Sequence, residues 1–163
     1  MTLDADDRPP RNASLGLPVR VLAGLAALGI PRVVAHDLAI GGPAVSALLA
    51  LVPIAVWLAV LVRLRHGSVM GTALALGGVY GVALAAAHQL LWAEAFDGRE
   101  PRLGGSLADL PDWAHAVITR AAAVAGGVAV GIGIGAALGA LAALVRSLLI
   151  RGPGSRADDS GRG

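Results

Sequence analysis

Few side chains in the apolar segments of this chain could take part in chemistry, and they lie near the ends of those segments. A histidine stands beside an aspartate at one segment end and beside a glutamine at another, with arginines nearby. Ionisable groups are costly inside a bilayer, so those that occur there are candidates for binding. The resulting polar cluster, our candidate site, comprises Arg32, His36, Asp37, His88, Gln89 and Arg120.

The chemistry open to this polar cluster is the binding of an anion, a lipid headgroup or a metal ion. Imidazole and carboxylate are common metal ligands, but neither His36 nor His88 belongs to a ligand-spaced motif such as His-x-x-x-His. The two histidines are therefore weak metal candidates, and no cofactor is predicted. Asp37 and Glu94 are the candidate counter-charges for this cluster. The alternative is that the arginines reach lipid phosphates while the histidines bond to backbone at helix ends.

Several kinds of chemistry lack their sequence signature here. The chain has no cysteine, and it contains no phosphate-binding loop, nucleophile elbow or zinc-protease motif. The run from Gly131 to Gly135 matches part of a dinucleotide-binding loop, but it lies inside an apolar stretch with no strand before it. Aromatic residues make up 3% of the chain, too few to stack on nucleic-acid bases. We predict no enzymatic activity and no nucleic-acid partner.

The elements that must position the polar cluster are membrane-spanning helices. Hydrophobic residues make up 56% of the 163 residues and charged residues only 15%, against about 25% charged in soluble domains. The first predicted span has the shortest charge-free run, and a cleaved signal peptide is the alternative for it. We predict spans at about 20–40, 43–62, 68–92 and 115–149, an acidic outside loop at 93–114, and disordered cytoplasmic tails at 1–19 and 150–163.

Glycine recurs every fourth residue in the last predicted span. In lipid such a row opens a groove that lets another helix backbone approach closely. The third predicted span carries a matching face of small residues, and we expect the two faces to meet, within one chain or between two copies. The expected packing glycines are Gly77, Gly81, Gly127, Gly131, Gly135 and Gly139. The predicted fold class is an all-α integral membrane protein, a four-helix transmembrane bundle with a glycine-zipper last helix.

This packing face leads to an expectation for substitutions. Leucine in place of Gly131 or Gly135 should block the close approach and disrupt assembly, whereas Leu138→Ala should be mild.

The distribution of arginine predicts the orientation of the spans. Cytoplasmic loops of membrane proteins carry an excess of basic residues. With both termini cytoplasmic, only Arg99 and Arg102 fall in outside loops, while Arg32 and Arg120 lie within or at the edge of spans. The predicted location is therefore the plasma membrane, with these arginines on the inside: Arg8, Arg11, Arg20, Arg63, Arg65, Arg146, Arg151, Arg156 and Arg162.

The four-span layout is similar to that of small bacterial exporters and fluoride channels. The exporters use a glutamate buried in the first span, where this chain offers only Arg32 and Asp37, and the channels use asparagine-rich pore motifs, whereas the only asparagine here is Asn12. No specific family is identified. We expect a non-enzymatic packing, assembly or partner-binding component whose partners are the lipid bilayer and a second copy of the chain.

Two other functions stay open from the sequence. One is a homo-oligomeric transporter or channel with an outward-facing polar pocket, which would need Arg32, Tyr80, His88 and Arg120 to face one cavity. The other is a metal- or haem-binding membrane subunit.

Overall fold

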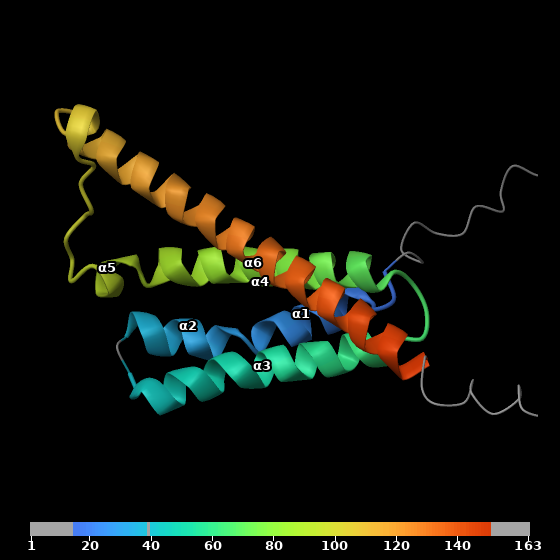
Figure 1. Ribbon diagram of the computed structural model, residues 1–163. Helices are drawn as coiled ribbons and strands as arrows, with labels where there is room; N and C mark the ends of the chain where they lie inside the picture. The colour runs from blue at the N-terminus through green and yellow to red at the C-terminus, as the bar shows by residue number, and fades with distance from the viewer. Residues whose placement is uncertain (1–14, 39, 151–163) are drawn as a thin grey trace, which may run out of the picture.

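The computed structural model describes residues 15–38 and 40–150, and this part of the chain is helical with connecting turns and loops (Figure 1). Four helical segments, Val19–Asp37, Pro43–Arg63, Val69–Leu90 and Asp112–Ile150, are long and apolar enough to cross a membrane. The predicted all-α chain with four such segments is confirmed. The elements are α1 (Val19–Ala27), α2 (Ile30–Asp37), α3 (Pro43–Arg63), α4 (Val69–Leu90), α5 (Trp92–Ala95), η2 (Gly105–Leu107) and α6 (Asp112–Ile150).

The predicted tails fall mostly on residues 1–14 and 151–163, outside the described residues. The sequence analysis placed residues 15–18 in the first tail. In the structure this segment packs against the helices. The backbone N–H of Gly16 donates to Oγ1 of Thr72 on α4 at 3.0 Å, and Leu15 and Leu17 pack against the hydrophobic core.

The first candidate span is two helices with a break between them. Pro31 has no N–H to donate to the carbonyl of Ala27, so the helical ladder is interrupted where α1 gives way to α2. The indole of Trp57 on α3 donates to the carbonyl of Leu25 at 2.8 Å just before the break. Gly29, at the break itself, lies against the ring of Tyr80, where a Cβ would come within 3.0 Å of Cδ2.

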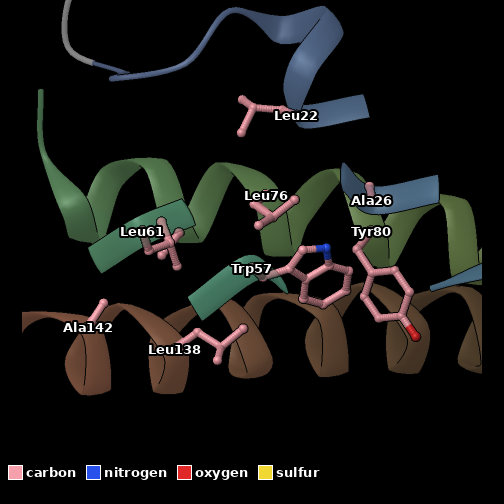
Figure 2. Close-up of a cluster of buried hydrophobic side chains, with 9 residues drawn as sticks. Leu22, Ala26, Trp57, Leu61, Leu76, Tyr80, Leu138 and Ala142 are labelled. Carbon is pink, nitrogen blue, oxygen red and sulfur yellow. The ribbon is translucent and has the colours of Figure 1, made fainter. Parts of the chain in front are cut away.

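The hydrophobic core lies at the centre of the four long helices (Figure 2). Trp57 and Tyr80 meet edge to face with ring centroids 5.1 Å apart, a favoured aromatic geometry. Leu138 of α6 is buried in the same cluster and is 6% exposed. Truncating a buried leucine removes many contacts and leaves a cavity, so the expectation that Leu138→Ala is mild loses its basis.

The backbones of α4 and α6 touch at four of the six predicted packing glycines. A Cβ on Gly77 would lie 2.8 Å from Cα of Gly135, and one on Gly131 would lie 2.6 Å from the nitrogen of Gly81. Such distances leave no room for a side chain. The other two glycines of the row lie against Ala85 and Met70. A Cβ on Gly127 would lie 3.3 Å from the Cβ and 3.4 Å from the backbone of Ala85, and one on Gly139 would lie 2.8 Å from the sulfur of Met70.

The last helix is much longer than its neighbours and crosses them obliquely. With 39 residues α6 is about 58 Å long. It crosses α4 at the glycine contact and diverges from it toward its own N-terminus (Figure 1). Beyond the crossing, α6 and α4 are therefore no longer in backbone contact, and side chains, the α5 turn and the following loop occupy the space between them.

The glycine contact gives the first prediction. Gly131→Leu and Gly135→Leu should each lower the unfolding temperature in detergent by several degrees, because overpacking costs about 1–3 kcal/mol where the backbones already touch. Gly133→Leu is the matched control, because Gly133 is exposed and has no atom within 4 Å of its Cβ position. All three changes raise helix propensity equally, so an equal melting temperature for the three variants would contradict close packing at this site.

Candidate functional site

The widening between α6 and α4 contains a cavity of about 820 Å³. This volume falls within the range of about 300–1,000 Å³ that is typical of small-molecule sites. Residues of α2, α4, α5, the following loop and α6 line it, whereas α3 contributes none of the described lining residues. The lining comprises Arg32, Val33, His36, Asp37, Tyr80, Leu84, His88, Trp92, Ala95, Phe96, Pro101, Leu103, Thr119, Ala122, Ala123, Gly126, Gly127, Val130 and Ile134.

Asp37, at the C-terminus of α2, is the most buried ionisable group of the cavity. Its side chain is 3% exposed, and each carboxylate oxygen has a histidine partner. Oδ2 lies 2.7 Å from Nδ1 of His88 on α4, and Oδ1 lies 3.2 Å from Nδ1 of His36. A buried carboxylate needs such partners, because burial without hydrogen bonds costs several kcal/mol.

Arg32 lies one and a half turns before this carboxylate and also lines the cavity. Its side chain is exposed, unlike that of Asp37. Four ion pairs occur within residues 15–38 and 40–150, and Arg32 belongs to none of them. The cavity therefore has a guanidinium that no described carboxylate approaches within salt-bridge distance.

Arg120 and Gln89 lie beside the cavity and do not line it. The guanidinium of Arg120 stacks over the Trp92 ring at 4.7 Å and donates to Oε1 of Glu100 at 2.8 Å. The indole of Trp92 donates to the other oxygen of Glu100 at 3.0 Å. Gln89 and Arg120 exchange two long contacts of 3.4 Å. We call Gln89, Trp92, Glu100 and Arg120 the Glu100 clamp.

The predicted polar cluster thus separates into two groups. Arg32, His36, Asp37 and His88 line one cavity, as a common pocket requires. The counter-charge of Arg120 is Glu100, and the expectation that Asp37 or Glu94 would serve Arg120 is wrong. Glu100 lies in an irregular loop, whose path back toward α6 no periodicity in the sequence could have predicted.

The clamp holds the loop after α5 over the cavity. Two further contacts tie this loop to α6: Arg102 donates to Asp112 at 2.7 Å, and the N–H of Leu103 donates to Nδ1 of His115 at 3.0 Å. His115 is 1% exposed, and its Nε2 is the one fully buried side-chain polar atom without a hydrogen-bond partner among the described residues. The loop residues Pro101 and Leu103 consequently form part of the cavity lining.

A metal-binding group of side chains and a second hollow are weaker candidates for a site than this cavity. No group of three His, Asp or Glu side chains is arranged to hold a metal ion within the described ranges, and the weak metal candidates His36 and His88 both bond to Asp37. A second hollow, of about 580 Å³, lies at the other end of the bundle and is lined by Arg63, Arg65 and His66 among others. These three side chains are exposed, so the cavity beside Asp37 is the candidate site.

The Glu100 clamp predicts a pH dependence. Hydrogen bonds from Arg120 and Trp92 hold the pKa of Glu100 below its ordinary value of 4.5. A lowered pKa in the folded state means that the carboxylate stabilises the fold above pH 4.5 and loses this effect as the pH falls through the lowered pKa. We expect Glu100→Gln to lower the melting temperature by a few degrees at pH 7.

The same variant supplies its own control at low pH, where Glu100 is uncharged in the parent chain as well. The difference between parent and Glu100→Gln should vanish below the lowered pKa, while other titrating groups affect both proteins equally. A difference that stays constant from pH 7 to pH 3 would contradict the clamp.

Comparison with protein-family models, with curated proteins and with solved structures gives no match to this chain. The functional argument therefore rests on the geometry of the cavity and its polar groups.

Proposed function

We propose that the chain is a non-enzymatic, multi-pass protein of the plasma membrane that binds a small ligand or partner in the cavity between α2, α4 and α6. The proposal has three parts: insertion in the membrane, orientation, and binding. Each is supported by different residues.

Membrane insertion is supported by the apolar surface of the long helices. On α3, Leu48 is 61% exposed and Leu51 is 63% exposed, and on α6 Leu144 is 54% exposed. Large apolar patches of this kind are rare on soluble monomers and match a hydrocarbon surrounding. The first segment behaves as part of the bundle, because Leu22 and Ala26 belong to the core. This supports a retained span over a cleaved signal peptide.

Orientation is supported by which charges lie at which end of the bundle. The cavity end carries the acidic loop with Arg99 and Arg102, and the opposite end carries Arg63, Arg65 and Arg146. The positive-inside rule then directs the cavity away from the cytoplasm and both termini toward it. The glycine zipper acts within one chain in this proposal, because α4 occupies the glycine face of α6. A homo-oligomer would use other faces.

Binding is supported by one observation above all, the buried carboxylate of Asp37 with its half-buried partner His88 in the wall of an otherwise mainly apolar cavity. A buried ion pair contributes little to stability compared with apolar residues of the same size. Ionisable groups at membrane depth are functional candidates for that reason. Packing alone does not explain why these positions carry ionisable residues. Binding of a ligand by the pair or by its neighbours does.

A transporter is the second candidate, and a specific observation favours it. Three of the four residues that a transport path would need line this cavity, namely Arg32, Tyr80 and His88. Arg120, the fourth, is held in the Glu100 clamp. The binding function is common to both candidates, and the next test addresses it.

A bulky side chain introduced into the cavity should prevent the ligand from binding there. Gly126 lines the cavity and has no atom within 4 Å of its Cβ position, so Gly126→Phe places a ring in the cavity without a backbone clash. Gly133→Phe is the control, on the same helix and equally unobstructed but outside the lining. Native mass spectrometry of protein purified in mild detergent should show a bound mass on the parent and on Gly133→Phe that Gly126→Phe lacks. A parent protein without bound mass, in native lipid extract, would contradict the proposal.

The orientation is tested separately. Green fluorescent protein fused to the C-terminus should fluoresce, and alkaline phosphatase at the same position should be inactive, because the first folds in the cytoplasm and the second outside it. Active phosphatase would overturn the assignment of the cavity to the outer side.

A further inference from the structure

We infer that the ligand of this cavity is an anionic lipid, with its acidic headgroup against Arg32 and one acyl chain lying along α6 from Ala122 to Ile134. The inference rests on the proposed binding function and names the class of ligand. Three features of the cavity carry it: its charge, its apolar wall and its opening.

The arginine of the cavity lining lacks a carboxylate partner among the described residues. Asp37 is engaged on both oxygens by His36 and His88 and is almost completely buried. Arg32 is exposed, lines the same cavity and belongs to no described ion pair. A guanidinium presents a planar fork of donors that matches a phosphate or carboxylate. The polar end of the cavity is therefore complementary to an anionic headgroup.

The wall opposite Arg32 suits an acyl chain. The α6 residues of the lining carry no charge, and from Ala122 to Ile134 the helix rises about 18 Å. This rise is close to the depth of one leaflet of hydrocarbon, about 15 Å. Gly126 and Gly127 of the lining have no side chains, and Leu84 and Tyr80 of α4 line the same cavity.

The cavity is partly open along α2 and α6. Its exposed lining residues include Arg32 and His36 of α2 and Gly126 and Val130 of α6. Helix α3 contributes none of the described lining residues here, and its Leu49, Pro53 and Ile54 line instead a small hollow of about 30 Å³ together with Arg32 and Ile134. Over the outer end, Pro101 and Leu103 belong to the loop that the Glu100 clamp ties to α6. A ligand that enters from the side, out of the bilayer, fits this shape better than a water-soluble anion does.

The experiment compares an anionic and a zwitterionic lipid that have the same acyl chains. Full-length protein in detergent is titrated with dioleoyl phosphatidylglycerol or dioleoyl phosphatidylcholine, and binding is followed by native mass spectrometry. We expect the anionic lipid to bind at least about tenfold more tightly. Arg32→Gln should reduce the preference to near unity, Arg32→Lys should retain part of it, and Arg99→Gln, an exposed loop arginine outside the lining, should leave it unchanged.

Each other outcome has a defined meaning. Equal binding of the two lipids to the parent, or an equal loss in Arg32→Gln and Arg99→Gln, overturns the inference while leaving a ligand-binding cavity in place. Inorganic phosphate that raises the melting temperature as much as phosphatidylglycerol, and does so through Arg32, overturns the lipid and indicates a soluble anion. If Gly126→Phe does not reduce lipid binding, the lipid binds outside the cavity and the inference is wrong. The mass that copurifies with that variant then shows separately whether the cavity holds a ligand.

Discussion

The contact between the backbones of α4 and α6 determines most of the remaining arrangement. Helices can approach this closely only where neither has a side chain, and Gly77, Gly81, Gly131 and Gly135 meet that condition over two turns. Because the contact lies in the middle of a 39-residue helix, the two ends of α6 are free to diverge from α4. The cavity beside Asp37 exists because the divergence toward the N-terminus of α6 is only partly filled by the α5 turn and its loop.

The polar groups at that end form two sets, one that stabilises the fold and one beside the cavity that we propose to bind a ligand. The Glu100 clamp and the two contacts of Arg102 and Leu103 fix the loop to α6. The Asp37 group fixes the end of α2 to α4 through His88, and it does so with a buried charge. Apolar residues could join the same helices at lower desolvation cost. Because Asp37 is held by two histidines, Arg32 is the cavity residue that has no described carboxylate partner, and we propose that Arg32 binds the headgroup of an anionic lipid.

The sequence predicted the parts of this structure that follow from periodicity. A repeat of four places Gly127, Gly131 and Gly135 on one helical face, and the matching face of the third span follows from the same geometry. It could not predict contacts made by irregular segments. Glu100 reaches Arg120 only because the loop folds back over α6, and the side chains that pack at the break between α1 and α2, Trp57 and Tyr80, come from other helices. Leu138 was misjudged because a buried leucine and a lipid-facing one look alike in an apolar run.

The length of α6 relates the shape of the cavity to the thickness of the membrane. Its uncharged stretch from Ala121 to Val145 is about 37 Å long, whereas a hydrocarbon core is about 30 Å thick. In the membrane location that we propose, tilting the helix is one way to accommodate the excess length. The glycine contact joins α6 to α4 near the middle of α6, so a change in tilt would change the distance between α4 and the N-terminal end of α6. We therefore expect the width of the cavity to vary with bilayer thickness, independently of which molecule occupies it.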